Sequence, residues 1–289
     1  MVDFVERKSI KIRPSGRSTD FISPSFGHGC LYNCTYCYMK RHKHTGLSIA
    51  NNPQDILDAI YNHRESLGTK IPNQTHEKYW TYDISCNEDF ILHLKYHSWL
   101  KIFSFFTDSS DIMGSLATKY VNEDLLLYKC VLKNMKIRIR MSLMPEEFRK
   151  VLEPNTSSIF KRIAFINRLK EVGYDVHVNF SPVIVVPGAL ALYEELFKTL
   201  DTIVEDKYKQ DVKAEVIFLT HNEKKHQYNL ENNLPGEELL WRPEKQESKV
   251  SQYGGKNLRY NWQLKRKLIQ EFTTLHDSII PWNTIRYIF

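Results

Sequence analysis

The feature that most constrains the fold is a regular alternation of predicted strands and helices between residues 20 and 219. Short β-branched or aromatic runs alternate with segments whose apolar residues recur at helical spacing, and no long linker interrupts them. Such alternation favours parallel strands joined by right-handed helical crossovers. The chain therefore predicts an α/β fold, a partial (β/α)6 barrel with its chemistry at the carboxyl ends of the strands.

Local signals set the limits of these elements. Asn52 and Pro53 suit the N-cap and first position of a helix, and Gly173 suits the left-handed residue that follows one. No Gly-x-Gly-x-x-Gly follows a predicted strand, so a dinucleotide-binding fold has no support. The predicted strands cover residues 20–26, 78–85, 115–120, 136–143, 175–185 and 213–219, and the helices cover 52–67, 90–106, 122–133, 157–172 and 189–204.

Both ends of the chain fall outside the alternation. Residues 1–20 are polar and basic and are interpreted as an N-terminal arm, so the barrel is expected to span 21–220. Residues 221–289 are predicted to form a C-terminal extension over the barrel mouth. Within it, Gly254 and Gly255 can turn a β-hairpin because both accept positive φ, and residues 262–276 have the pattern of a final helix.

Three cysteines, Cys30, Cys34 and Cys37, follow the first predicted strand at a C-x3-C-x2-C spacing. A compact loop can aim three soft thiolates at one metal centre. In a [4Fe-4S] cluster, three protein ligands leave one iron open to a small molecule. This spacing is the radical SAM signature, in which S-adenosylmethionine binds the open iron. The alternative is a zinc site, which needs a fourth ligand such as His28, His42 or His44.

The composition is that of a soluble protein able to bind polyanions. The net charge is +6 with a pI near 8.9, and basic residues cluster at 40–44, 136–140 and 265–267, the last interpreted as a solvated face. No apolar run approaches the roughly 20 residues of a spanning helix, and no signal-peptide core is present. Three of the five cysteines fall within eight positions, which indicates metal binding in a reducing, cytoplasmic compartment.

Two further features point to the barrel mouth. Cys86 stands at the end of the second predicted strand, where its thiol could reach the mouth or could simply be buried as a small hydrophobic group. In the fourth predicted strand Arg138, Arg140 and Ser142 alternate with apolar residues. The arginines could bind a carboxylate or phosphate in an open cavity, or the strand could be an edge strand with one wet face.

Together these motifs resemble the spore photoproduct lyase family. The chain carries Cys34-Thr35-Tyr36-Cys37-Tyr38, Ser85-Cys86-x-x-Asp89, Thr118-Lys119, Arg138-x-Arg140-x-Ser142, Glu153-Pro154-x-Thr156-Ser157, Ser181-Pro182 and Tyr253-Gly254 in the family's order. Those enzymes are radical SAM DNA-repair proteins on a partial β/α barrel. The resemblance runs from about Ser23 to the C-terminus and is patchy between motifs.

The resemblance implies a role for each matching residue. Cys30, Cys34 and Cys37 would hold the [4Fe-4S] cluster, and Lys119, Ser142 and Asp89 would contact S-adenosylmethionine. Cys86 would give a hydrogen atom to the product thymine radical, with Tyr36 and Tyr38 relaying the radical back toward the cofactor; packing of the cluster loop is the plainer reading of both tyrosines. The residues expected to bind the damaged DNA are Arg138, Arg140, Tyr253, Gly254 and Lys256.

The resemblance also implies partners, and two departures leave alternatives open. The expected partners are DNA containing a methylene-bridged thymine dimer and an electron donor such as flavodoxin or ferredoxin. The chain has Glu88 where the family usually has serine, and Gln252 where it usually has arginine. Both put the substrate in doubt, so a modified RNA base or a peptide is the second hypothesis. A zinc-dependent nucleic-acid-binding protein is the third.

Overall fold

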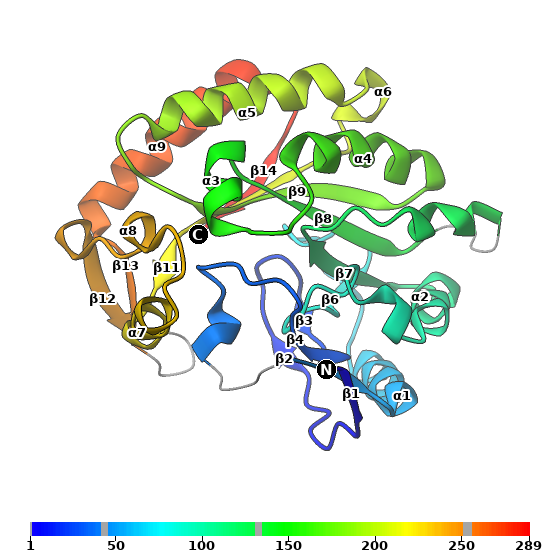
Figure 1. Cartoon of the computed structure of the whole chain (residues 1–289). Coiled ribbons are helices and arrows are strands. Elements are labelled where there is room, and N and C mark those ends of the chain that lie inside the picture. The colour runs from blue at the N-terminus through cyan, green and yellow to red at the C-terminus, as the bar shows by residue number, and fades with distance from the viewer. Residues whose placement is uncertain (1, 42–45, 131–134, 251–255) are drawn as a thin grey trace.

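The computed structural model describes residues 2–41, 46–130, 135–250 and 256–289. Its centre is a curved sheet of eight strands (Figure 1). Among these strands, only β2 runs antiparallel to its neighbour; the other pairings are parallel. In order along the sheet the strands are β14 (Ile285–Ile288), β10 (Ala214–Phe218), β9 (Asp175–Val183), β8 (Ile137–Leu143), β7 (Ile112–Thr118), β6 (Trp80–Asp83), β3 (Phe21–Ile22) and β2 (Arg13–Pro14).

The prediction of a partial β/α barrel is confirmed. Each predicted strand contributes to the sheet, although the first is reduced to the two residues of β3. Strand β8 is buried along its whole length, which is the usual condition of a central strand in a parallel sheet. The sequence order of β3, β6, β7, β8, β9 and β10 is also their order in space, so the carboxyl ends of these strands meet at one rim.

Helices cover the outer, convex side of the sheet (Figure 1). Phe103 and Phe106 of α2 and Ile163 and Ile166 of α4 are fully buried, as expected for amphipathic helices packed on a sheet. Burying each such side chain contributes roughly 1.5–3 kcal/mol. The helices on this side are α1 (Pro53–Glu65), α2 (Trp99–Asp108), α4 (Ile159–Val172), α5 (Ala189–Ile203) and α9 (Trp262–Ile279).

Two predicted helices differ from the structure. The helix expected over 90–106 begins at Trp99, because the preceding segment is held in turns by the carboxylates of Glu88 and Asp89. The helix expected over 122–133 is a 3₁₀ helix, η3 (Glu123–Cys130), and residues 131–134 lie outside the described part of the chain. Asn122 accepts a hydrogen bond from the amide of Asp124 at 3.0 Å, a local turn that competes with α-helix formation.

The expected N-terminal arm, residues 1–20, contributes strands to two sheets. Strand β1 (Val2–Val5) pairs with β5 (Leu47–Ala50), which in turn pairs with β4 (Gly27–Gly29). Strand β2 pairs with the nearby β3 and closes one edge of the barrel sheet. The pairing of β1 with β5, more than 40 residues along the chain, is one that local composition cannot reveal.

The C-terminal extension contains the expected hairpin and final helix. Strands β12 (Gln246–Val250) and β13 (Lys256–Tyr260) pair antiparallel on either side of residues 251–255, which lie outside the described residues. The last strand, β14, pairs with β10, so the barrel sheet also includes a strand from the C-terminal extension.

The remaining short elements complete the chain. They are η1 (Tyr38–Arg41), η2 (Leu94–Tyr96), α3 (Glu146–Leu152), α6 (Asp206–Lys209), β11 (Thr220–His221), α7 (Glu223–Glu231), α8 (Glu237–Leu240) and η4 (Pro243–Lys245). Helix α7, which has little apolar character, lies against η1 next to the cysteine loop. Within the described part of the chain, no helix combines the length and apolarity needed to cross a membrane.

Candidate active site

A cavity of about 470 Å³ opens at the carboxyl ends of β6, β7 and β10. The segment after β6 forms one wall, and the cysteine loop after β4 forms another. Most of the predicted site residues line this single cavity, although they come from four separate segments of the chain: Cys30, Cys34, Tyr36, Cys37, Tyr38, Cys86, Asp89, Lys119 and Arg140.

The cysteine loop leaves β4 through a close backbone contact. Gly29 has a φ of 100°, and a side chain there would meet the carbonyl oxygen of Gly46 at 2.2 Å, so only glycine fits. The amide of Cys37 donates to the carbonyl of Cys34 at 3.0 Å, which folds the C-x2-C segment into a turn. This geometry lets all three thiols face the same cavity.

The spacing of the three sulfur atoms distinguishes between the two metal hypotheses. Tetrahedral Zn–S bonds of about 2.3 Å would bring the sulfurs to about 3.8 Å from one another. In the structure the three sulfurs do not all lie within 4.8 Å of one another, and His28 belongs to no such compact group. His42 and His44 lie outside the described residues. As placed, the three thiols do not form the compact set that a single zinc ion needs, which favours a four-iron cluster with one open iron.

Burial favours the protonated form of two of the three loop thiols, Cys30 and Cys34. Burial and the nearby Asp89 carboxylate raise the pKa of Cys30 to about 12. Burial and Glu153 likewise raise the pKa of Cys34 well above its ordinary value. Assembly of a cluster must therefore displace protons from these side chains.

Cys86 lies in the same cavity, close to the hydroxyl of Tyr38, which donates a hydrogen bond to Asn87 Oδ1 at 3.2 Å. The guanidinium of Arg13 is 3.8 Å from its sulfur. Burial and the Asp83 carboxylate raise the pKa of Cys86, and this outweighs the opposing effects of Arg13 and Tyr38. The side chain is consequently a neutral thiol at pH 7, which is the form that can give up a hydrogen atom.

Tyr36 is held by a buried ion pair. Its hydroxyl donates to Glu153, whose other carboxylate oxygen lies 2.6 Å from Nη2 of Arg162. Both charged side chains are fully buried. Burial and the Glu153 carboxylate raise the pKa of Tyr36 well above its ordinary value, and Lys119 Nζ lies 5.7 Å from the centre of the ring.

Asp89 positions the segment that carries Lys119. Its carboxylate accepts hydrogen bonds from Thr118 Oγ1 at 2.7 Å, the Lys119 amide at 2.8 Å and the Leu92 amide at 3.1 Å. Burial lowers the pKa of Lys119, but the carboxylates of Glu153 and Asp89 outweigh burial and the net shift is upward. The Lys119 ammonium therefore stays charged at the cavity.

The alternating polar residues of β8 are distributed differently from the prediction. Ser142 is buried and does not line the cavity, while its carbonyl accepts from Arg162 at 2.8 Å. Arg140 lines the cavity but is 4% exposed and binds Asp83 at 2.8 Å and Glu215 at 3.5 Å. Its carboxylate partners thus belong to the protein itself, which leaves its expected contact with DNA without support.

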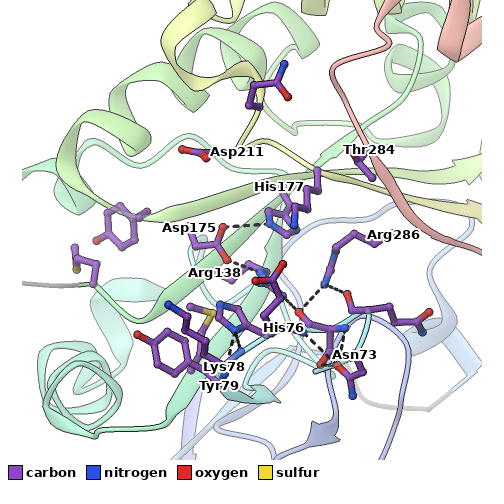
Figure 2. A pocket seen from close by; sticks show the side chains of 18 of the residues that line it. Asn73, His76, Lys78, Tyr79, Arg138, Asp175, His177, Asp211, Thr284 and Arg286 are labelled. Carbon is purple, nitrogen blue, oxygen red and sulfur yellow. Dashed lines mark hydrogen bonds and ion pairs between the residues drawn. The ribbon is translucent and has the colours of Figure 1, made fainter. Parts of the chain in front are cut away.

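Arg138 faces a second cavity, of about 810 Å³, at the opposite ends of the strands (Figure 2). Its Nε lies 2.6 Å from Asp175, which also pairs with His177 at 3.1 Å, and its Nη1 donates to the carbonyl of Thr75. These bonds attach the 73–79 loop to the barrel. Although this cavity is larger, it contains none of the cysteines, so the smaller cavity is the candidate active site.

Glu88 is not a free charge in the active site. One of its carboxylate oxygens lies 2.9 Å from both His93 Nδ1 and His97 Nε2, and its side chain is 1% exposed. The other ring nitrogen of His93 accepts from the Leu31 amide at 3.3 Å, directly after Cys30. The sequence motifs do not reveal this support of the cysteine loop, although the spacing of Glu88, His93 and His97 is a visible signal.

The predicted hairpin contacts lie partly outside the described residues. Tyr253 and Gly254 fall in 251–255, whereas Lys256 begins β13 and is exposed. A smaller cavity of about 230 Å³ lies between the hairpin strands and the active site, and the two cavities share Arg17 and Phe289.

Four cations surround this smaller cavity and were not recognised from the sequence: Arg17, Lys249, Arg259 and Lys265. Burial and the other three cations lower the pKa of Lys265, which reflects a strongly positive surface. Residues 265–267 were predicted to form a solvated face. Lys267 is 72% exposed, as predicted, whereas Lys265 lines the cavity.

The partial barrel, the loop of three separated thiols at its rim and the facing charged lysine define an enzyme of the radical SAM class. The family model for spore photoproduct lyase matches residues 3–289, and the chain belongs to this family. Spore photoproduct lyase of Bacillus subtilis (strain 168) is 27% identical over 293 residues, which cover 97% of this chain and 80% of that protein.

Solved structures share the fold at lower sequence identity. A spore photoproduct lyase complexed with dinucleoside spore photoproduct has a TM-score of 0.87 at 20% identity. A mutant spore photoproduct lyase with bound AdoMet and dinucleoside spore photoproduct has a TM-score of 0.87 at 19% identity. Each match covers 100% of this chain and 82% of the other, so the barrel and its C-terminal elements have the family's arrangement.

We expect Arg162→Ala to destabilise the protein strongly, because it leaves Glu153 charged and buried without its cation. Removing one partner of a buried pair typically costs about 3–5 kcal/mol. Urea unfolding measured by circular dichroism would show the loss as a lower midpoint.

The matched control is Arg168→Ala on the same helix. Arg168 pairs with Glu123, and their side chains are 52% and 60% exposed, so this change should cost only about 0–1 kcal/mol. Equal losses in the two variants would contradict the importance assigned to the buried pair.

Proposed function

We propose that this protein is a radical SAM lyase that repairs a methylene-bridged thymine dimer in DNA. The observation that carries the proposal is the meeting of the cysteine loop, the Cys86 thiol and Lys119 in one cavity. Membership of the spore photoproduct lyase family supports the same activity. The relatives crystallised with dinucleoside spore photoproduct indicate the class of lesion.

The cofactor would be held by residues of two walls. Cys30, Cys34 and Cys37 would bind the [4Fe-4S] cluster, and the Lys119 ammonium could bind the carboxylate of S-adenosylmethionine. When bound, this pair supplies a 5′-deoxyadenosyl radical that takes a hydrogen atom from the lesion. Asp89 contributes by fixing the backbone of Thr118 and Lys119. The predicted contact between Ser142 and S-adenosylmethionine stays a prediction, because Ser142 is buried and does not line the cavity.

Cys86 is the proposed hydrogen-atom donor. Its S–H bond would break as a C–H bond forms on the product thymine radical, leaving a sulfur radical on the protein. The raised pKa of Cys86 keeps the hydrogen on sulfur, and the lining of the cavity by Cys86 makes contact with a bound lesion possible. A thiolate, by contrast, would have no hydrogen atom to give.

Tyr38 and Tyr36 are proposed to return the radical toward the cofactor. The hydroxyl of Tyr38 lies close to Cys86, so the O–H bond of Tyr38 would break as the S–H bond of Cys86 forms again. The hydroxyl of Tyr36 donates to Glu153, so Glu153 can accept the phenol proton when Tyr36 gives up an electron.

Duplex DNA would approach from the side of the hairpin. The lesion must leave the base stack to enter the cavity, which costs a few kcal/mol and least for a damaged base. Arg17, Lys249, Arg259 and Lys265 are suitably placed to bind phosphates on the way to the cavity. Tyr253 and Gly254 lie outside the described residues, and their proposed role of wedging into the duplex stays a prediction.

The structure weakens one reason for a different substrate. Glu88 was expected to add negative charge near the lesion, but two imidazoles bind its carboxylate. Gln252 lies outside the described residues. An RNA base or peptide thus retains less support than damaged DNA. The electron donor, flavodoxin or ferredoxin, and the cytoplasmic location stay predictions.

We expect Cys86→Ala to separate cofactor cleavage from repair. The anaerobically reconstituted variant, given S-adenosylmethionine, dithionite and dinucleoside spore photoproduct, should still form 5′-deoxyadenosine. Its yield of repaired thymine should fall by about tenfold or more, equivalent to at least about 1.4 kcal/mol of lost transition-state stabilisation. Chromatography of both products measures the ratio.

A matched variant and the parent protein complete this experiment. Cys37→Ala should lose the brown cluster and both products, since it removes a metal ligand. If the parent protein cleaves S-adenosylmethionine with irradiated DNA or the dinucleoside but forms no thymine product, the repair proposal fails. Cofactor cleavage stimulated by RNA and not by irradiated DNA would favour a modified RNA base as the substrate.

We expect Tyr38→Phe to impair later turnovers more than the first. The substitution removes the hydroxyl that lies close to Cys86 but leaves the thiol in place. A single-turnover assay should therefore give near-normal repaired thymine, whereas multiple-turnover assays should slow by about tenfold. An equal loss in both assays would argue that Tyr38 has a packing role only.

We expect Lys265→Ala to weaken DNA binding in a salt-dependent way. If Lys265 contacts a phosphate, its loss should reduce the slope of log K against log salt concentration by about 1. Fluorescence anisotropy with a labelled duplex at several salt concentrations measures this slope. Lys267→Ala, a neighbouring exposed residue on α9, is the control; identical slopes for the two variants would place the DNA elsewhere.

A further inference from the structure

A second group of metal-ligating side chains lies behind the cysteine loop. His221 of β11, His226 of α7 and Glu237 of α8 bring one ligand atom each within 4.8 Å of the others, and they are the only such group among the described residues. A single carboxylate oxygen of Glu237 is 2.8 Å from His221 Nε2 and 2.7 Å from His226 Nδ1. Three separate elements thus converge on one point.

The surrounding residues hold these ligands in place. Asn229 donates to the second carboxylate oxygen of Glu237 and, at 3.0 Å, to the carbonyl of Thr35. The ring of Trp241 stacks on His226 at 4.1 Å and meets the edge of His221 at 5.8 Å. Such outer contacts are typical of metal sites, where they fix the orientation of the ligands.

We propose that His221, His226 and Glu237 bind one divalent cation, with zinc preferred and water in the fourth position. Zinc bonds of about 2.0–2.2 Å to nitrogen and oxygen place tetrahedral ligand atoms about 3.3 Å apart. The present separations of 2.7 and 2.8 Å need to widen by only about 0.5 Å. The His226 side chain is 16% exposed, which gives water and the ion a path to the site.

This site would support the cysteine loop without taking part in the chemistry. Asn229 bonds the carbonyl of Thr35, and Lys225 Nζ bonds the carbonyl of Tyr36 at 3.1 Å. An ion that joins β11, α7 and α8 would hold both donors against the loop. The inference rests on residues outside the proposed catalytic set, so it stands or falls independently of DNA repair.

Elemental analysis of the reconstituted holoprotein tests the proposal. After expression with added zinc, we expect about one zinc per chain in addition to the cluster iron. His226→Gln and Glu237→Gln should lose the zinc, with affinity reduced by about tenfold or more, and should retain their iron. Glu231→Gln, the same substitution at an exposed position on α7, should bind zinc like the parent protein.

X-ray absorption at the zinc edge identifies the ligands. Nitrogen and oxygen neighbours without sulfur would place the ion at His221, His226 and Glu237. Zinc with sulfur neighbours, zinc retained in both variants, or no zinc bound after titration of the chelator-treated protein would each overturn the proposal. In those cases the group is a hydrogen-bonded His–Glu–His triad without a metal.

Discussion

The active site depends on a buried ion pair between Arg162 of α4 and Glu153. Taking two ions out of water costs several kcal/mol for each, so such a pair persists only when further hydrogen bonds complete it. Here Arg162 also donates to the carbonyl of Ser142 in β8, and Glu153 accepts from Tyr36 in the cysteine loop. The outer helix, the barrel wall and the cluster loop are therefore joined at one guanidinium.

Two glutamates extend this support to the remaining sides of the cysteine loop. Glu88 binds His93, which accepts from the amide of Leu31, and Glu237 binds Asn229, which donates to the carbonyl of Thr35. Both carboxylates are buried and face two imidazoles each. The loop is thus held through its backbone, which leaves its three thiols free to face the cavity.

The periodic parts of the chain could be predicted because their signals are local. Alternating strands and helices, the Pro53 start of α1 and the Gly173 end of α4 each follow from neighbouring residues. Strand β14 and helix α7 could not be predicted in this way: β14 is defined by its pairing with β10, and α7 is polar and stabilised by the cysteine loop it contacts. The same holds for Lys265, whose cation neighbours come from distant segments.

By itself the sequence determined the fold class, the candidate thiol ligands and the candidate donor Cys86, because residue type and spacing specify them. The tertiary structure alone decided which charged side chains remain available to bind a ligand. Arg138 and Arg140 occupy the expected face of β8, yet they bind Asp175, Asp83 and Glu215 from other strands. A side chain's partner depends on which distant segment is brought beside it, and burial makes that pairing obligatory because an unpaired charge is too costly in the interior.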